Sequence, residues 1–306
     1  MNILIIGLGS VAKKHISAIR QLQPDAVLYA LRSGYDSENH DNIHNIYSLD
    51  EIKVTPEFIL IANPTALHEG LIVKCLKFGC PLFIEKPVLS TLKNADAIIG
   101  LIQRSGINTY VSCNMRFHPA IQFLKSYLEL NKLTINEVNI YSGSYLPEWR
   151  QSRDFRTIYS AHANMGGGVH LDMIHELDYC VWLFGAPDNV KSEKRSVSSL
   201  AIDSIDFAQF TLLYPSFSVN LTLNYYRRDA KREIEVLTSE DTITVDMIGN
   251  KISSKVSGIC LFQKEFKMIE TYKEQMSYFI DCIQSRKQPM NDIEFGIEIL
   301  KIALYE

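Results

Sequence analysis

Two short segments of this chain carry side chains that could stabilise a developing negative charge and move a proton. The first is Glu85-Lys86-Pro87, which closes the apolar run Pro81-Leu82-Phe83-Ile84. The second holds Asp172 and His175, three residues apart in a stretch with helical spacing, which predicts both side chains on one helix face. An ammonium group suits a developing alkoxide, and an imidazole exchanges protons near neutral pH. The two segments predict chemistry on a hydroxyl or carbonyl group.

A glycine turn near the amino terminus predicts a dinucleotide site. Gly7-Leu8-Gly9-Ser10-Val11-Ala12 follows the apolar run Ile3-Leu4-Ile5-Ile6 and opens a helix-like stretch. In such a turn the first Gly permits the tight turn, the second lets the backbone approach the pyrophosphate, and the small Ala12 lets helix pack on strand. Backbone donors at the helix start then face the phosphates. Lys86 would end another strand of the same sheet, at the edge where such sheets bind ligands.

The residues after the second expected strand bear on the choice between NAD and NADP. An acidic side chain is expected about 20 residues after the glycine turn, where it would accept a hydrogen bond from the ribose 2′-hydroxyl. This chain has Leu31-Arg32-Ser33 instead. Arg32 and Ser33 offer donors to a 2′-phosphate, which favours NADP over NAD. Asp36 or Glu38 swinging in, or a solvated Arg32, are the alternatives.

Short apolar runs alternate with helical stretches over residues 1–115, and this alternation predicts parallel crossovers and a doubly wound sheet. A capping box, Ser48-Leu49-Asp50-Glu51, can start a short helix, and Gly79 can end one. The expected strands are 3–6, 26–31, 58–62, 82–85 and 109–113, and the longer expected helices are 11–22, 66–78 and 92–104.

The second half has a different pattern. Its strand-like runs at 207–213, 218–225, 234–237 and 242–246 are joined by turns too short for parallel crossovers, which predicts a large, mainly antiparallel open sheet. Helices are expected at 171–184, 272–284 and 292–304. We expect a Rossmann domain over residues 1–118 and a substrate-binding and oligomerisation α/β domain over residues 119–306.

Composition restricts the class of protein. The 306 residues are 46% hydrophobic and 22% charged, with a formal net charge of −4, so nucleic acid is not an expected partner. No apolar run approaches the roughly 20 residues that span a bilayer, and we expect no membrane association. Six scattered cysteines form no Cys-x-x-Cys pair, which favours reduced thiols and a cytoplasmic location.

Several motifs together resemble one family, the Gfo/Idh/MocA oxidoreductases. They are the glycine turn, His15, Asn63-Pro64-Thr65 with His68, Glu85-Lys86-Pro87, Asn114-Met115-Arg116-Phe117, and the segment from Gly166 to Asp178. The resemblance covers nearly the whole chain in the right order. It implies a Rossmann domain followed by an α/β domain with an open antiparallel sheet. It also implies NAD(P)-dependent oxidation or reduction of sugars, cyclitols and their derivatives.

The resemblance assigns roles to individual residues. Lys86 would be the catalytic lysine on the reacting oxygen, with Pro87 after a cis peptide and Glu85 on the nicotinamide ribose. His175 would be the acid/base group and Asp172 its neighbour, although the usual spacing is Asp-x-x-x-His and this chain matches a branch with the shorter Asp-x-x-His. The remaining cofactor contacts implied are Gly7, Gly9, Ser10, Val11, Ala12, Arg32, Ser33, Asn63, Pro64, Thr65, His68 and Asn114.

A polar, aromatic loop before the Asp172 segment is the expected substrate side. Trp149, Arg156 and Tyr159 in this loop, together with Arg116, Lys86, Asp172 and His175, are the candidate substrate-binding residues. Arginines and aromatic rings suit a carboxylate or phosphate and a sugar ring, which favours an acidic or nucleotide-linked sugar. The resemblance to the short-spacing branch implies sugars of the surface-polysaccharide type. A solvated charged loop is the alternative. Tyr225-Tyr226-Arg227-Arg228 could also reach the substrate, or simply turn the sheet.

The predicted function is therefore a sugar dehydrogenase or reductase that acts on CH–OH groups. The alternatives are a reductase of a non-sugar carbonyl compound and a non-catalytic dinucleotide-binding sensor. We expect no metal, because His170 and His175 would point to different helix faces and Cys113 and Cys180 add no paired spacing. We expect a homodimer or homotetramer that pairs through an apolar face of the C-terminal sheet.

Overall fold

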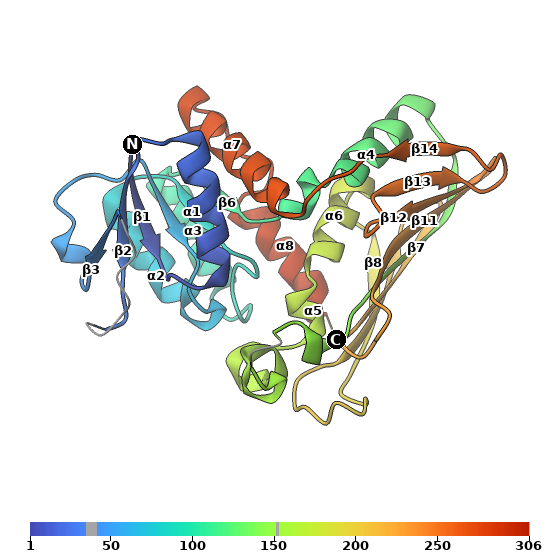
Figure 1. The fold of residues 1–306 in the computed structure, drawn as a ribbon, viewed down its shortest axis with the longest axis horizontal. Coiled ribbons are helices and arrows are strands. Elements are labelled where there is room, and N and C mark those ends of the chain that lie inside the picture. The colour runs from blue at the N-terminus through green and yellow to red at the C-terminus, as the bar shows by residue number, and fades with distance from the viewer. Residues whose placement is uncertain (35–41, 151–152, 306) are drawn as a thin grey trace. The chain divides into compact units, whose positions relative to one another are not determined.

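The computed structural model describes residues 1–34, 42–150 and 153–305, and the chain divides into two compact units (Figure 1). The first unit comprises Met1–Asn114 and Met268–Glu298. The second comprises Met115–Lys267 and Ile299–Glu306. In the described ranges, no helix is both long and apolar enough to cross a membrane.

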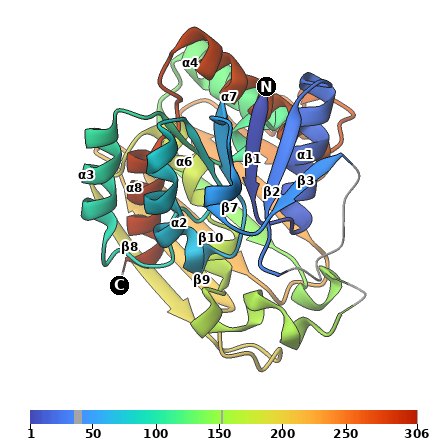
Figure 2. The same cartoon turned by 90° about the vertical axis from the view of Figure 1, so that its left-hand side faces the viewer.

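The first unit is built on a six-stranded parallel sheet. Its order is β3-β2-β1-β4-β5-β6, so the order reverses between β1 and β4, and β2 lies between β1 and β3 (Figure 2). Ligands of such sheets bind beyond the carboxyl ends of the strands at this reversal. The doubly wound sheet predicted from the sequence is confirmed. The strands are β1 Asn2–Ile6, β2 Val27–Leu31, β3 Ile43–Ile46, β4 Phe58–Ile61, β5 Leu82–Ile84 and β6 Thr109–Val111.

The helices of this unit begin and end at recognisable residues. The longer ones are α1 Ser10–Leu22, α2 His68–Cys75, α3 Ala95–Ser105 and α7 Ile269–Ser285. Gly79 and Gly106 adopt left-handed conformations directly after helical segments, where a Cβ is disfavoured. The Ser48 hydroxyl accepts from the Asp50 amide as a cap, but it opens only a single 3-10 turn, Leu49–Glu51.

The returning helix α7 belongs to the first unit, whereas the sequence analysis placed it in the second domain. Met276, Phe279 and Ile280 are buried in the core cluster of the parallel sheet. The Phe279 ring meets Phe58 and Phe83 edge-on, with centroids 5.3 and 5.2 Å apart. The amphipathic pattern of α7 predicts that it packs on a core. It does not specify which core, because the partner sheet is distant in the sequence.

The second unit is an eight-stranded sheet with helices on one side (Figure 1). Its order is β14-β13-β12-β11-β7-β10-β9-β8; β10 pairs with β7 in parallel and the other neighbours are antiparallel, as predicted for most of the sheet. The strands are β7 Ile135–Gly143, β8 Asn189–Arg195, β9 Phe207–Leu213, β10 Ser218–Asn224, β11 Lys231–Thr238, β12 Thr242–Asp246, β13 Lys251–Ser254 and β14 Cys260–Gln263. The helices are α4 Pro119–Asn131, α5 Val169–Asp172 and α6 His175–Phe184, and α8 Ile293–Leu304 closes the chain.

The side of this sheet away from the helices is mainly polar, so the expectation of an apolar face is wrong. Along β7 and β10 the buried positions are apolar except at the strand ends, where Ser142 and Asn224 are buried, and the alternate positions are mostly partly exposed. Those alternate positions form a ladder of side-chain hydrogen bonds. Asn220 donates to Asn139 at 3.3 Å, and Thr211 donates to Asn220 at 3.4 Å. Strand periodicity places these residues on one face, and their types make it hydrophilic.

Replacing Phe279 by Ala tests whether α7 is part of the first unit's core. We expect the free energy of unfolding to fall by about 3–5 kcal/mol, because the ring is fully buried between two other rings. Chemical denaturation measures the change. Ile269→Ala, at a 43% exposed position of the same helix, should change stability by less than about 0.5 kcal/mol. Equal effects of the two substitutions would show that α7 is not part of this core.

Candidate functional site

The glycine turn lies at the carboxyl end of β1, and its two glycines have different surroundings. Gly7 has φ +89°, and a Cβ there would lie 2.8 Å from the backbone N and Cα of Asn63. A Cβ on Gly9 would meet no atom of the described structure within 4 Å. Gly9 caps the start of α1, and no described side chain bonds to the cap. The open space and the free backbone donors fit a pyrophosphate group at this helix start.

The side chains after β2 are placed by a strand that the sequence analysis missed. Arg32 follows β2 directly; its amide donates to the Ile46 carbonyl, and its guanidinium donates to Asn45 on β3 at 3.1 Å. Ser33 is exposed. Asp36 and Glu38, the acidic alternatives, lie outside the described residues. Arg32 and Ser33 are thus the side chains that the described structure presents at this strand end.

His68 is fully buried and holds two loops together. Its Nε2 lies 2.9 Å from the Asn63 carbonyl oxygen, and its Nδ1 lies 3.2 Å from that of Val88. Burial lowers the pKa of His68, against the opposing effect of these carbonyls. His68 was predicted to bind the cofactor. In the structure its ring nitrogens face the turn after β4 and the segment after Pro87, so it positions both loops from behind.

Glu85, Lys86 and Pro87 follow β5, two strands from β1 in the same sheet. The Lys86–Pro87 peptide bond is cis, as the resemblance implied. Glu85 is buried; its Oε1 lies 2.5 Å from His15 Nε2, and its Oε2 accepts from the Lys86 amide at 3.2 Å. Burial alone would raise the pKa of Glu85. The hydrogen bond and charge of His15, with the charge of Lys86, outweigh burial and lower it.

Asn114 was also predicted to contact the cofactor, and its amide has a partner within the first unit. The Asn114 Nδ2 donates to Thr271 Oγ1 at 2.7 Å, and the side chain is 5% exposed. This bond ties the end of the first chain segment to the start of α7. The amide therefore stabilises the return of the chain to the parallel sheet.

The helix predicted over 171–184 is broken between Asp172 and His175. Asp172 is the last residue of α5, His175 is the first of α6, and Met173 between them has non-helical angles (φ −98°, ψ 28°). The two side chains are not carried on one continuous helix, so the shared-face prediction is wrong. Asp172 is buried, whereas His175 is partly exposed.

The glycine triplet before α5 allows close contact between two backbone segments. Gly166 and Gly168 have φ of +80° and +133°. A Cβ on Gly167 would lie 2.2 Å from the Tyr159 carbonyl oxygen and 2.8 Å from those of Ser160 and His162. Only glycine permits this contact. It fixes the polar loop against the start of α5.

Two tyrosine hydroxyls hold the Asp172 carboxylate. Tyr225, just beyond β10, donates to Asp172 Oδ2 at 2.6 Å in a buried bond, and the Tyr159 hydroxyl also hydrogen-bonds to Asp172. Burial and the charge of Asp172 raise the pKa of both tyrosines, so they remain donors at neutral pH. The Trp149 ring meets the Tyr225 ring edge-on at 5.3 Å. The sequence analysis left open whether Tyr225 reaches the substrate or only turns the sheet. In the structure Tyr225 is buried, whereas the next residue, Tyr226, is 36% exposed.

Arg116 is fully buried and bound by Asp178, which differs from its predicted contact with substrate. Its Nε donates to Asp178 Oδ1 at 2.6 Å, and its Nη2 donates to Oδ2 at 3.1 Å. The guanidinium lies 5.6 Å from the Trp182 ring centroid. Asp178 is one turn along α6 from His175. Arg116 therefore fixes the helix that begins with the candidate acid/base residue.

The polar loop presents its outer side chains to solvent. Trp149 is 39% exposed and donates from Nε1 to Ser144 at 2.9 Å. Arg156 is exposed, and its guanidinium lies 3.6 Å from Asp154. Tyr159 is 40% exposed. The loop thus offers an indole, a phenol and a guanidinium that a polar ligand can contact.

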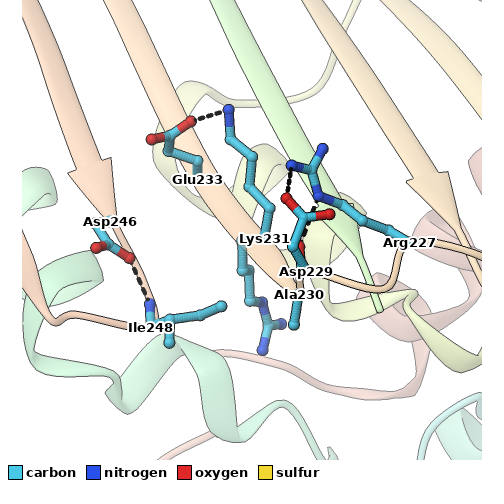
Figure 3. A pocket seen from close by; sticks show the side chains of 8 residues that line it. Arg227, Asp229, Ala230, Lys231, Glu233, Asp246 and Ile248 are labelled. Carbon is cyan, nitrogen blue, oxygen red and sulfur yellow. Dashed lines mark hydrogen bonds and ion pairs between the residues drawn. The ribbon is translucent and has the colours of Figure 1, made fainter. Parts of the chain in front are cut away.

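A surface pocket of about 330 Å³ lies beside the β10–β11 turn (Figure 3). Its charged groups are paired: Arg227 with Asp229 at 2.6 Å, Lys231 with Glu233, and Arg232 with Glu176 at 2.7 Å. Of the residues that the sequence analysis considered for the substrate, Arg227 lines this pocket. Across residues 1–34, 42–150 and 153–305, no group of three or more His, Cys, Asp and Glu side chains is arranged to hold a metal ion.

Comparison with known proteins matches both units. Residues 1–112 match the family model described as the oxidoreductase family with NAD-binding Rossmann fold, and residues 133–244 match that of the GFO/IDH/MocA C-terminal domain. The chain is 23% identical over 258 residues to scyllo-inositol 2-dehydrogenase (NAD(+)) of Bacillus subtilis, covering 79% of this chain and 72% of that protein. It is 23% identical to myo-inositol 2-dehydrogenase of Thermotoga maritima, covering 97% and 92%.

Solved structures share the whole fold. The UDP-N-acetylglucosamine 3-dehydrogenase of Acidithiobacillus ferrooxidans superposes with a TM-score of 0.78 at 21% identity, covering 99% of this chain and 95% of that chain. The WlbA dehydrogenase of Bordetella pertussis, solved with NADH and UDP-GlcNAcA, superposes with a TM-score of 0.83 at 17% identity, covering 100% and 94%.

Replacing Asp178 by Asn tests the buried pair that holds α6. We expect a loss of about 3–5 kcal/mol in the free energy of unfolding, because the buried Arg116 guanidinium loses its counter-charge. Denaturation monitored by circular dichroism measures it. Asp154→Asn, which weakens an exposed pair, should cost less than about 1 kcal/mol. A loss for Asp178→Asn no larger than for this control would remove the structural role assigned to the pair.

Proposed function

The chain belongs to the Gfo/Idh/MocA family of oxidoreductases, and on that premise we propose that it transfers a hydride between a nicotinamide dinucleotide and a ring carbon of a sugar or sugar derivative. One observation carries the proposal: the open, uncapped glycine turn follows β1, and Lys86 follows β5 in the same parallel sheet. Both therefore lie at the carboxyl edge of that sheet. The named relatives, which include inositol dehydrogenases, support a polyol or sugar substrate.

The chain's own residues divide the work of binding and proton transfer. The nicotinamide cofactor supplies the hydride acceptor or donor. Lys86 binds the reacting oxygen and stabilises the negative charge that develops on it. His175 takes the hydroxyl proton during oxidation, directly or through Lys86, and returns it during reduction. Asp172, held by Tyr225 and Tyr159, is the carboxylate beside this proton transfer.

We propose NADP as the preferred cofactor. Arg32 and Ser33 stand at the end of β2, where a 2′-phosphate would be bound, and both carry hydrogen-bond donors. The bond from Arg32 to Asn45 orients the guanidinium along this strand end. Gly7, Gly9, Ser10, Val11 and Ala12 would bind the pyrophosphate, and Asn63, Pro64, Thr65 and Glu85 would line the nicotinamide side.

An acidic or nucleotide-linked sugar is the substrate class that we propose. The support is the exposed Arg156 guanidinium beside the Trp149 and Tyr159 rings, because a guanidinium binds carboxylate or phosphate oxygens and rings stack on sugars. A curated relative and two solved structures of the same fold act on or bind such compounds.

We further propose a cytoplasmic homodimer or homotetramer. All six cysteines are free thiols, which suits a reducing compartment. The polar outer face of the eight-stranded sheet, with its Asn139 and Asn220 ladder, is the proposed contact between copies. Sedimentation analysis of wild type and of a variant in which Asn139 and Asn220 are both replaced by Asp tests this contact, because the added negative charges should dissociate the oligomer.

The function is tested by following reduced nicotinamide absorbance with NADP and NAD separately. The substrate panel holds inositols, free sugars, sugar acids and UDP-linked sugars. We expect turnover with one sugar class and higher kcat/KM with NADP. Tight dinucleotide binding without turnover on the whole panel would instead favour a non-sugar carbonyl substrate or a sensor.

Replacing Lys86 by Met tests the proposed catalytic lysine. We expect kcat to fall by about 10²- to 10⁴-fold, because the reacting oxygen loses its proton donor and positive charge. Dinucleotide affinity, measured by calorimetry, should stay at the wild-type value. Lys77→Met, at an exposed lysine paired with Asp50, is the matched control. Wild-type turnover by the Lys86 variant would exclude the mechanism.

Replacing Tyr225 by Phe removes one of the two hydroxyls on Asp172. We expect kcat to fall about tenfold or more, because the carboxylate loses a charge-assisted hydrogen bond that fixes it. Tyr226→Phe removes the neighbouring, partly exposed hydroxyl and should leave kcat unchanged. Steady-state kinetics of both variants, with unfolding curves, provide the measurement. Equal kcat values for the two variants would show that the hydrogen bond from Tyr225 to Asp172 does not contribute to turnover.

A further inference from the structure

His15 on α1 is a buried polar residue that the proposed chemistry does not use. Its side chain is fully buried, with the ring centroid 4.9 Å from that of Phe83 and 5.2 Å from that of Tyr272. Its Nε2 lies 2.5 Å from Glu85 Oε1. Its Nδ1 has no hydrogen-bond partner among the described residues. The imidazole is therefore committed to a single polar contact.

This arrangement is costly for the fold. An unpaired ring nitrogen and a carboxylate taken out of water each oppose folding. The neighbouring positions on the same helix face, Ala12, Ile16 and Ile19, are buried and apolar. An apolar residue at position 15 would complete that face without the cost. Packing of α1 alone does not account for a histidine here.

The contact has a direct consequence for Lys86. Glu85 has two carboxylate oxygens: Oε1 is held by His15, and Oε2 accepts from the Lys86 amide. Fixing the first oxygen fixes the second, and with it the backbone that carries the lysine. The positive charge of Lys86 also lowers the pKa of Glu85.

We propose that His15 is a positioning residue for the reaction: through Glu85 it fixes the backbone that carries Lys86. This rests on the proposed function, in which Lys86 contacts the reacting oxygen. The charged and titratable groups around Glu85 are His15 from α1, Lys86 beside it and His68 from α2, with the Ser112 hydroxyl after β6. Tyr272 contacts the imidazole, and Lys14 lies 4.9 Å from the Tyr272 ring centroid.

The activity test compares His15→Phe with His15→Gln. Phe keeps a ring but removes the donor, whereas Gln can restore a donor to Glu85. We expect His15→Phe to lower kcat about tenfold to a hundredfold, the loss expected from one hydrogen bond to a charged group, and His15→Gln to recover most of it. Ile19→Ala, on the same buried face, should reduce stability without lowering kcat.

The pH profile separates this role from simple packing. In the wild type, His15 and Lys86 keep the pKa of Glu85 low, so the carboxylate stays ionised to acidic pH. In His15→Phe only Lys86 and the Ser112 hydroxyl still oppose the effect of burial, and Glu85 takes up a proton at higher pH. The acidic limb of the kcat profile should therefore move to higher pH in His15→Phe and stay in place in Ile19→Ala.

A readout without turnover distinguishes failure of this inference from failure of the proposed function. Reductive methylation of lysines, followed by mass spectrometry, reports the reactivity of Lys86 against Lys77 as an internal reference. We expect Lys86 to be methylated roughly threefold to tenfold faster in His15→Phe, because the backbone that carries the lysine is no longer fixed through Glu85 Oε2. A changed rate in a protein inactive on every sugar would support the inference while rejecting the function. An unchanged rate, with unchanged kcat and pH profile, would overturn the inference.

Discussion

A charge removed from water needs a partner, and this requirement organises the side chains that look reactive. Three of the buried carboxylates lie on or beside candidate site residues: Glu85, Asp172 and Asp178. Each is held by different chemistry, respectively an imidazole, two phenols and a guanidinium. The partners cost free energy to bury as well. The groups that remain partly exposed, Lys86 and His175, are carried directly beside these held carboxylates or one helical turn away. The buried carboxylates thus give rigid support, and the residues near them in the sequence, Lys86 and His175, remain accessible.

Close backbone contacts at glycine residues also fix the loops that carry candidate site residues. Gly7 lets the first turn lie against Asn63, whose carbonyl is in turn bonded by the buried His68. Gly167 plays the same part in the second unit, where a side chain would collide with three carbonyl oxygens of the polar loop. In both units a glycine joins two loops that carry candidate site residues. The loops are fixed by sterics, which leaves their polar side chains available for ligands.

The sequence predicts features that depend on local chemistry or on period. The parallel sheet, the glycine turn, the cis peptide before Pro87 and the mainly antiparallel second sheet are all confirmed. It does not predict where distant partners come from. Helix α7 packs on the core of the first unit through Phe279. Arg116 forms an ion pair with Asp178, and Tyr225 donates a hydrogen bond to Asp172. In each case the two partners are far apart in the sequence. The break between α5 and α6 is also invisible to a helical period, because apolar residues continue through Met173 and Ile174. Arg116 was misassigned for the same reason: an arginine in a motif gives no sign of whether its partner is a substrate or a buried carboxylate.

The fold and the substrate are decided by different parts of the molecule. Structures at 17–21% identity share nearly the whole chain's fold, yet likeness of that kind constrains backbone and leaves side-chain chemistry open. The held carboxylates and the glycine contacts are made within the chain, so they do not distinguish one substrate from another. Discrimination needs groups that reach solvent, and in the polar loop these include Trp149, Arg156 and Tyr159. Tyr159 belongs to both sets, because it is exposed and also bonded to Asp172. A ligand that contacts the Tyr159 hydroxyl would therefore alter the support of the Asp172 carboxylate. In the proposed function, this contact would couple substrate recognition in the loop to proton transfer.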